Sequence, residues 1–243
     1  MNLLIDMGNT RLKWGGAKGG QIITGQSLMN ARINRKELIE LWKDIARPRR
    51  LAVSCVSANR LLELVQSVAL ELWPDVDIVV VKSQAQAFGV TNAYQQPGKL
   101  GVDRWLSLVA AWQQYQAPAC IVDCGTAITV DLIDADGRHQ GGLIIPGLTL
   151  MKESLGQGTE ALSYSETKHE FALANYTEAA IYSGTLMAAI GLIEHVLAQQ
   201  PSGIQLILTG GDAELIAGQL SAVSTVDPDL VLRGLLCVLE GHV

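Results

Sequence analysis

The sequence predicts an α/β protein made of two similar halves, residues 1–116 and 117–243. Two observations predict this organisation. A short apolar run ends in an Asp-x-Gly motif at Asp6–Gly8, and a second run ends in the same way at Asp123–Gly125, so each copy lies near the start of one half. The elements that follow each copy also repeat in order, with adjoining strands first and then helices that alternate with strands.

In the first half, apolar runs and turn residues define the expected elements. Asn34 and Glu37 have the spacing of a capping box, which predicts a helix start at Arg35, and apolar residues three and four apart predict the helices. We expect strands at 3–5, 11–17, 21–25, 51–56 and 78–81, helices at 35–46, 57–72 and 100–115, and a loop at 84–101. The Gly19-Gly20 turn joins the second and third strands.

The second half begins after Ala117-Pro118 and repeats this order. We expect strands at 120–123, 128–133, 142–145 and 204–208, and helices at 148–155, 177–199, 212–219 and 229–240. Asp136-Gly137 supplies the turn before the third strand. Duplicated strands and crossover helices led by Asp-x-Gly loops resemble the ribonuclease H-like domains of the actin, sugar kinase and Hsp70 superfamily. That resemblance concerns the fold and does not by itself fix the chemistry.

Composition narrows the functional class. The chain has 243 residues, 49% of them hydrophobic, a net charge of −6 and a pI near 5.2. An acidic protein of this kind is not expected to bind nucleic acid as its main role. The start lacks a basic region followed by a long apolar run, and the apolar stretch at 186–193 is too short for a membrane span, so we expect a cytoplasmic protein without a membrane partner. Four cysteines without a C-x-x-C pair indicate thiols in a reducing compartment.

The two Asp-x-Gly loops are the candidate phosphate site. The sequence contains no Walker A motif and no G-x-G-x-x-G motif. Gly8 allows the backbone to approach a phosphate closely, Asn9 and Thr10 can donate hydrogen bonds, and Asp6 can contact a hydrated cation. Thr126 plays the corresponding part in the second loop. Carboxylates repel a polyphosphate unless cations lie between them, and the cation we expect is Mg²⁺ bound with the nucleotide.

Two further segments carry polar chemistry. Asp103 and Arg104 lie at a helix start led by glycine, where Arg104 could bind a substrate carboxylate and Asp103 could accept a hydroxyl proton. A helix-stabilising aspartate beside a surface arginine is the simpler reading. Lys13 either reaches phosphate oxygens or is a solvated strand lysine. The Thr209–Asp212 segment either contacts an adenine or only turns the chain between a strand and a helix.

Three motifs together resemble the type III pantothenate kinases. They are D-x-G-N-T-x-x-K at Asp6–Lys13, Y-x-x-P-x-x-L-G-x-D-R at Tyr94–Arg104, and D-x-G-T-A-x-T at Asp123–Thr129. The resemblance implies ATP-dependent phosphorylation of pantothenate, the first step of coenzyme A synthesis, by a homodimer that uses Mg²⁺ with ATP and K⁺ or NH₄⁺.

The same resemblance assigns roles to individual residues. Asp103 would be the general base, and Asp123 would bind the monovalent cation, with a water-mediated Mg²⁺ contact for Asp6. The ATP-binding set would be Asp6, Met7, Gly8, Asn9, Thr10, Arg11, Leu12, Lys13 and Thr126. The pantothenate-binding set would be Tyr94, Gly101, Val102, Asp103, Arg104 and Thr177. The chain departs from the family at Tyr176, where an asparagine is expected, and at Ser163, where a proline is expected.

Two other functions fit the predicted fold. A phosphohydrolase of the exopolyphosphatase kind would use water in place of an alcohol, and it would not need the carboxylate-binding pair at Asp103-Arg104. An accessory transcription factor could keep the fold without catalytic residues. Here Asp6, Asp103, Arg104 and Asp123 are all present, which favours the kinase.

Overall fold

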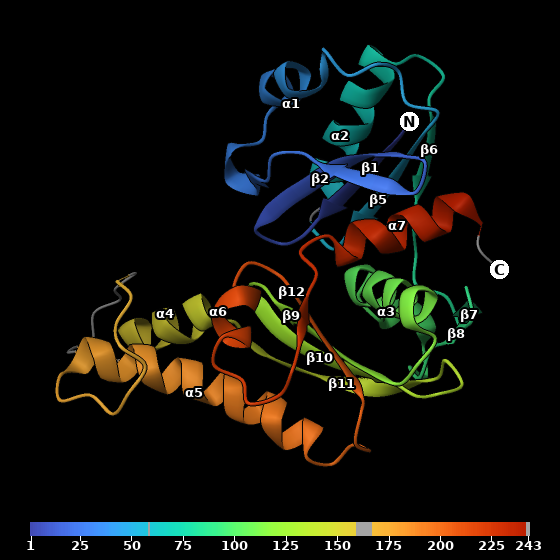
Figure 1. Ribbon diagram of the computed structural model, residues 1–243. Helices are drawn as coiled ribbons and strands as arrows, with labels where there is room; N and C mark the ends of the chain where they lie inside the picture. Colours follow the sequence, from blue (N-terminus) through green and yellow to red (C-terminus); the bar gives the residue numbers. More distant parts are fainter. Residues whose placement is uncertain (58, 159–166, 242–243) are drawn as a thin grey trace. The chain divides into compact units, whose positions relative to one another are not determined.

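The computed structural model describes every residue except 58, 159–166 and 242–243. The chain forms two compact units (Figure 1). Unit 1 contains Met1–Gln116, Gly137–His139 and Asp229–Val243, and unit 2 contains Ala117–Asp136 and Gln140–Pro228. The sequence placed all of residues 117–243 in the second half, whereas in the structure the turn at 137–139 and the C-terminal segment pack with the first.

Unit 1 is built on a six-stranded mixed sheet with the strand order β3-β2-β1-β5-β6, in which β4 also pairs with β2. Its strands are β1 (Asn2–Met7), β2 (Arg11–Lys18), β3 (Gln21–Thr24), β4 (Leu28–Met29), β5 (Arg50–Cys55) and β6 (Asp77–Val80), and a separate hairpin contains β7 (Gln86–Ala87) and β8 (Val90–Thr91). Its helices are α1 (Arg35–Trp42), α2 (Asn59–Leu72), α3 (Val102–Tyr115) and α7 (Leu230–Glu240), with 3₁₀ turns η1 (Asn30–Arg32) and η2 (Pro97–Lys99).

Alternation along β1 and β5 directs side chains to both faces of this sheet. Leu3, Ile5 and Val53 face the core formed with α1 and α2. Leu4 and Ala52 are fully buried on the opposite face, where α7 contacts β1 and β5. Figure 1 shows α1 and α2 on one side of the sheet and α7 on the other. The hydrophobic pattern of these central strands therefore reflects burial on both faces.

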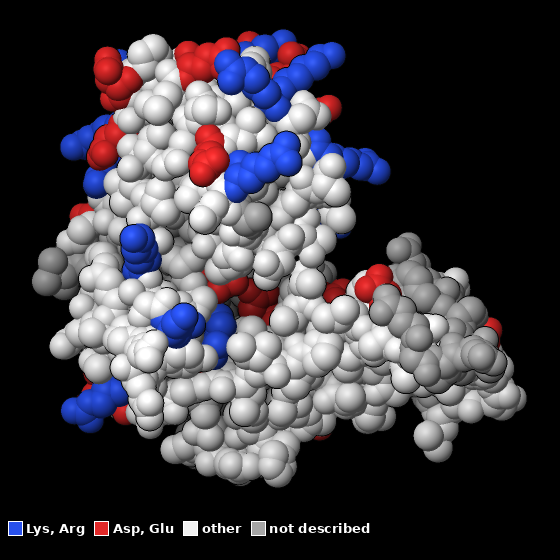
Figure 2. Space-filling model, turned by 180° about the vertical axis from the view of Figure 1, so that it is seen from behind, with Lys and Arg blue, Asp and Glu red and all other residues white. Residues whose placement is uncertain are grey.

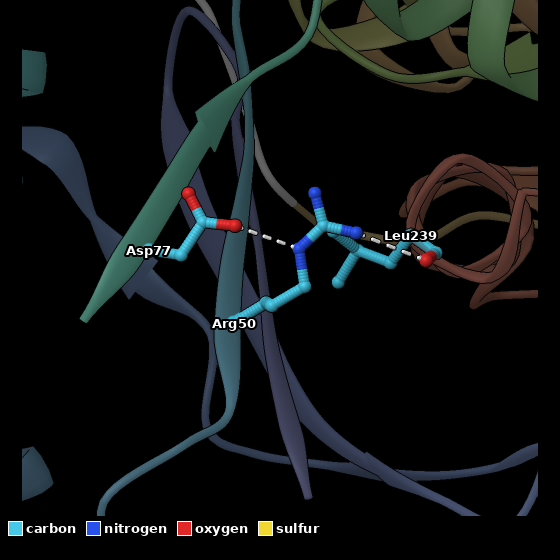
Figure 3. A network of polar contacts seen from close by, with 3 residues as sticks. All are labelled: Arg50, Asp77 and Leu239. Carbon is cyan, nitrogen blue, oxygen red and sulfur yellow. Dashed lines mark hydrogen bonds and ion pairs between the residues drawn. The ribbon is translucent and has the colours of Figure 1, made fainter.

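Within unit 1, hydrogen bonds of Arg50 connect the starts of β5 and β6 to the end of α7 (Figure 3). Arg50 and Asp77 are the first residues of neighbouring parallel strands and lie opposite each other. Arg50 Nε donates to Asp77 Oδ2 at 2.8 Å, and Arg50 Nη1 donates to the carbonyl of Leu239 at 3.1 Å. The guanidinium thus binds one of the last carbonyls of α7, which has no partner within its own helix.

Unit 2 has a five-stranded sheet with the order β11-β10-β9-β12-β13. Its strands are β9 (Ala119–Cys124), β10 (Ala127–Ile133), β11 (His139–Pro146), β12 (Gln205–Thr209) and β13 (Thr225–Val226), and its helices are α4 (Leu148–Gly158), α5 (Thr177–Leu197) and α6 (Ala213–Ala217). As in unit 1, the first strand of the unit pairs antiparallel with the second and parallel with a later one. Both predicted Asp-x-Gly motifs thus end a central strand.

Helix α5 contributes to the core of unit 2. It is long and apolar enough to cross a membrane by length and composition, with 39% of its apolar window buried. A core helix of a soluble protein passes the same test. Six of its side chains belong to the hydrophobic core cluster of the unit: Tyr182, Leu186, Ala189, Ile190, Ile193 and Val196. Figure 1 shows α4 and α5 along one side of the unit 2 sheet.

Two of the differences from the predicted elements are at the end of α1 and in the segment 84–101. Helix α1 ends at Trp42 instead of Ala46, and beyond its end the carbonyl of Ile45 accepts a hydrogen bond from Trp73 Nε1 at 3.1 Å. The expected loop at 84–101 contains the β7–β8 hairpin, which turns through Phe88 with a φ of 54°. A phenylalanine rarely adopts this conformation, and although Gly89 beside it, with a φ of 74°, favours a turn, the two-residue strands are too short for an alternating pattern to predict them. Gln113 Nε2 binds the Phe88 carbonyl at 2.8 Å and holds it.

The charged side chains are mixed in sign on the face shown in Figure 2. Lys and Arg side chains lie among Asp and Glu side chains there, and no extended basic area is visible among the residues that the figure colours or draws in white.

Candidate active site

The first Asp-x-Gly motif forms the turn of the β1–β2 hairpin in unit 1. Asp6 lies opposite Lys13 on β2 and beside Ser54 on β5. The turn is closed by a hydrogen bond from the Gly8 N–H to the Arg11 carbonyl at 3.0 Å. The predicted ATP-binding residues from Asp6 to Lys13 therefore form one continuous strand-turn-strand segment, and Asn9, Thr10 and Arg11 are exposed at its tip.

Asn30 holds this turn from outside the motif. Its side-chain amide donates to the carbonyls of Gly8 at 2.8 Å and Asn9 at 2.9 Å, and its backbone N–H donates to the Thr10 carbonyl at 2.8 Å. Three consecutive carbonyls are thus bound by one residue of η1. The sequence interpretation missed Asn30, since the contacts join segments about twenty residues apart and no spacing signals them.

Lys13 forms an ion pair with Asp229. Its Nζ lies 2.9 Å from Asp229 Oδ1, and Thr24 Oγ1 donates to Asp229 Oδ2 at 2.7 Å. Burial raises the pKa of Asp229, but the hydrogen bonds from Lys13 and Thr24 outweigh it, so this pKa lies below its ordinary value. Of the two readings of Lys13, the solvated strand lysine does not describe it, because only 26% of the side chain is exposed.

The second Asp-x-Gly motif forms the β9–β10 turn of unit 2, and backbone contacts hold it. Gly125 N–H donates to Ala127 O, Gly147 N–H to Thr126 O, and Asp212 N–H to Cys124 O, at 3.1, 2.9 and 3.0 Å. Thr126 is exposed at the tip. Burial raises the pKa of the Cys124 thiol within this loop, so the thiol remains protonated at neutral pH.

Gly210 packs directly against this turn. Its φ is +94°, and a Cβ atom built on it would lie 2.5 Å from Asp123 Oδ1 and 2.6 Å from the Cys124 carbonyl oxygen. Only glycine combines that backbone conformation with so close an approach. The carboxylate of Asp123 and a carbonyl oxygen therefore lie next to each other beside the Thr209–Asp212 segment. Among the described residues, no group of three or more His, Cys, Asp or Glu side chains could hold a metal ion.

A pocket of about 210 Å³ opens beside Asp212 in unit 2. Its lining combines apolar residues with hydroxyl and charged groups from α4, α5, the start of α6 and the segment before α5. It comprises Leu148, Thr149, Lys152, Lys168, Tyr182, Thr185, Leu186, Asp212 and Leu215. Burial raises the pKa of Asp212, and Lys152 and Lys168 lower it only in part. The strand-to-helix turn at 209–212 thus borders a small polar pocket.

The predicted acceptor residues lie together in unit 1 at the start of α3. Arg104 is buried, with 6% of its surface exposed, and its Nη1 donates to the Tyr94 hydroxyl at 2.8 Å. Its guanidinium carbon also lies 5.6 Å from the centre of the Tyr94 ring, within the range of a cation–π interaction. Arg104 is therefore not the surface arginine of the simpler reading.

Asp103 and Gly101 form the first turn of α3. Asp103 Oδ1 accepts the Arg104 N–H at 2.8 Å, and a Cβ atom on Gly101 would lie 2.5 Å from the same oxygen. Gly101 thus leaves room for the carboxylate, while Val102 packs inward. Asn92, a second residue that the sequence interpretation missed, shapes the segment before α3. It donates to the carbonyls of Gln84 and Pro97 and accepts the Tyr94 N–H, at 3.1, 3.2 and 3.0 Å.

Thr177 is exposed at the first position of α5 in unit 2. Tyr176, which replaces the expected asparagine, is the N-cap residue and makes no side-chain capping bond. Its hydroxyl instead lies 3.1 Å from His169 Nδ1. The other departure from the family, at Ser163, lies outside the described residues. The structure thus groups Asp6–Lys13 and Tyr94–Arg104 in unit 1, and Asp123, Thr126 and Thr177 in unit 2.

The fold resembles that of solved structures. One is a Campylobacter jejuni protein described as a Baf family transcriptional activator, with a TM-score of 0.62 and 20% identity over 98% of this chain and 97% of that one. Another is the activator of 2-hydroxyisocaproyl-CoA dehydratase from Clostridium difficile with bound ADPNP, with a TM-score of 0.56 and 14% identity over 99% and 94%. Together with the paired sheets, these similarities confirm the predicted fold.

Sequence comparison identifies the family. A Nitrosococcus oceani type III pantothenate kinase is 37% identical over 97% of this chain and 92% of its own length. A Halorhodospira halophila protein of the same name is 36% identical over 97% and 96%, and one from Dichelobacter nodosus is 31% identical over 99% and 98%. The sequence model of type III pantothenate kinases matches residues 2–199. The chain therefore belongs to the type III pantothenate kinase family.

Proposed function

We propose that this protein transfers a phosphoryl group from ATP to pantothenate, the first step of coenzyme A synthesis. The observation that carries the proposal is the similarity to type III pantothenate kinases along 97% of the chain at 37% identity. The grouping of Tyr94, Asp103 and Arg104 at one helix start supports it, since a kinase with a carboxylate-bearing alcohol as acceptor needs a cation and a base close together.

The two hairpin turns bind the ATP phosphates. In unit 1, Asn9 and Thr10 are exposed at the tip of a turn whose carbonyls are held by Asn30, which is where a phosphate would meet them. In unit 2, Thr126 occupies the same place in the second turn. Lys13 contributes positive charge near the first turn, although its ammonium is shared with Asp229.

Arg104 binds the pantothenate carboxylate. A guanidinium presents five N–H donors in a planar fork that matches a carboxylate, and Arg104 Nη1 also donates to the Tyr94 hydroxyl. Because Arg104 is almost fully buried, an ion pair with a carboxylate is weakly screened there. Tyr94 accepts from Arg104 through its oxygen, so its own O–H can donate to the same ligand. Gly101, Val102 and Thr177 complete the proposed acceptor set.

Asp103 is the general base. Phosphoryl transfer passes through a loose transition state, in which the bond to the attacking hydroxyl is little formed, so the hydroxyl proton becomes acidic only late. An aspartate of ordinary acidity can therefore accept the proton late in the reaction. The Arg104 N–H fixes one carboxylate oxygen of Asp103 at the start of α3, which orients the base.

Cations balance the charge of the phosphates. Mg²⁺ supplies electrostatic stabilisation of the phosphate oxygens when it accompanies ATP. Asp6 can contact it through water. Asp123 and the neighbouring Cys124 carbonyl are hard oxygen donors, the kind that suits K⁺ or NH₄⁺.

The pocket beside Gly210 and Asp212 receives the base of ATP. Its volume of about 210 Å³ and its apolar residues Leu148 and Leu186 suit a flat heterocycle, and Asp212 and Thr149 provide polar contacts. The alternative is that the Thr209–Asp212 segment only turns the chain. That alternative explains why Gly210 packs against Asp123, but it does not explain the pocket. We also propose that the protein works in the cytoplasm as a homodimer.

The test is an assay of ATP loss with and without pantothenate, repeated with K⁺ replaced by Na⁺. We expect ATP loss and formation of phosphopantothenate only when pantothenate is present. We also expect a strong decrease in the reaction rate when Na⁺ replaces K⁺. ATP loss without pantothenate would indicate a phosphohydrolase and contradict the proposal. Sequence-specific DNA binding by an inactive protein would indicate the transcriptional role instead. Equal rates in K⁺ and Na⁺ would reject only the role given to Asp123.

A further inference from the structure

We infer that His139 is a positioning residue of the acceptor site, which holds the ring of Tyr94 and, through Tyr94, the guanidinium of Arg104. His139 lies outside the three sequence motifs, as the first residue of β11. This inference rests on the proposed function, because it assumes that Tyr94 and Arg104 bind the acceptor.

The contacts form a short chain of three side chains within unit 1. The rings of His139 and Tyr94 are stacked, with their centres 6.1 Å apart and an angle of 15° between their planes. Tyr94 in turn receives the hydrogen bond from Arg104 at 2.8 Å and the cation–π contact at 5.6 Å. His139 is 3% exposed and Arg104 is 6% exposed, so both partners of Tyr94 are fixed in the interior.

His139 itself is held by the turn that precedes it. The Thr91 N–H donates to the Gly137 carbonyl at 2.9 Å, and Thr91 also forms a bridge with Arg138. Gly137 has a φ of +77°, and a Cβ atom there would overlap the Gly89 carbonyl and lie 3.0 Å from the Trp112 ring. The turn at 137–139 is thus tightly packed against β8 and α3, and it carries the imidazole to Tyr94.

Side-chain contacts fix the ring of Tyr94, because the residue lies outside regular secondary structure. The residue is half-buried and lies in an irregular segment between β8 and η2. Asn92 accepts a hydrogen bond from the backbone N–H of Tyr94, whereas His139 stacks on the Tyr94 ring. Without the stacked imidazole, the ring would sample other rotamers, and the guanidinium of Arg104 would lose its preferred orientation. A residue that only fills space would not affect one substrate more than the other.

The test compares His139→Leu, which keeps apolar volume without a ring, with His139→Phe, which keeps a ring for stacking. We expect His139→Leu to raise KM for pantothenate about tenfold, with kcat and KM for ATP within about twofold of wild type. We expect His139→Phe to restore KM for pantothenate to within about threefold of wild type. The matched control is His195→Ala, an exposed histidine of α5 that should change none of these values.

The outcomes separate the inference from the proposed function. Unchanged KM for pantothenate in His139→Leu would overturn the inference, as would equal losses for both substrates in the Leu and Phe variants. A His139→Leu protein that does not fold, shown by the absence of a cooperative thermal transition, would also count against it, because a core role would then explain the residue. A wild-type protein without pantothenate-dependent activity would overturn the proposed function instead.

Discussion

Replacing Asn30 by alanine should impair the use of ATP without touching any residue of the phosphate motifs. The change removes the two side-chain hydrogen bonds to the Gly8 and Asn9 carbonyls and leaves the backbone bond to Thr10. Each such bond contributes about 0.5–1.5 kcal/mol net, so the turn loses about 1–3 kcal/mol of the free energy that orders it. If ATP must restore that order when it binds, kcat/KM for ATP falls by roughly five- to 150-fold.

The assay is initial-rate kinetics with ATP and pantothenate varied in turn. Asn92→Ala is a matched control, since it also removes two side-chain amide donations to carbonyls, but in the acceptor segment. Asn30→Ala should lower kcat/KM for ATP most, and Asn92→Ala should mainly raise KM for pantothenate. The reasoning is refuted if Asn30→Ala keeps kcat/KM for ATP within twofold of wild type while Asn92→Ala shows its effect.

Three further predictions follow from the contacts described above. Asp103→Asn should lower kcat by about 10²–10⁴ while calorimetry still detects pantothenate binding, and activity within a few-fold of wild type would remove Asp103 as the base. Gly210→Ala should destabilise the protein by at least about 1 kcal/mol in thermal unfolding, because alanine at a φ of +94° is strained and its Cβ meets Asp123; an unchanged Tm would contradict this contact. Asp229→Asn should lower the free energy of unfolding at neutral pH and approach wild type in acid. The pKa of Asp229 is lowered in the folded state, so its stabilisation is present above the ordinary pKa of 3.8 and is lost as the pH falls through the folded value. If the free energies of unfolding of wild type and Asp229→Asn still differ at pH 2, that assignment is refuted.

The sequence predicted the parts of the site that depend on local pattern. The Asp6–Thr10 and Asp123–Thr126 turns each end an apolar strand, which is visible in the order of residues alone. The capping box at Asn34 and Glu37 is a similar case, and in the structure Asn34 Oδ1 accepts the Glu37 N–H at 3.0 Å. Such features are encoded within four or five neighbouring residues, so sequence patterns capture them.

The residues that support the site could not be predicted in the same way. Asn30, Asn92 and His139 act on atoms that are brought to them by the fold. Asn92 lies in an irregular segment and Asn30 in a three-residue 3₁₀ turn, and neither shows a side-chain periodicity. Asn30 binds backbone carbonyls, which every residue has, so its partners leave no trace in the sequence. His139 depends on Gly137 packing against Gly89 and Trp112, a contact between parts of unit 1 that are far apart along the chain.

The two Asp-x-Gly turns share a motif but differ in what holds them. The first turn depends on the side chain of Asn30, whereas the second is held by the backbone N–H groups of Gly125, Gly147 and Asp212. A single side-chain truncation can therefore loosen the first turn, but no truncation removes the bonds of the second. Substitutions that add a Cβ atom, as at Gly210, act on the second turn instead. Side-chain variation should thus tune the unit 1 turn, while the unit 2 turn is sensitive to the loss of glycine.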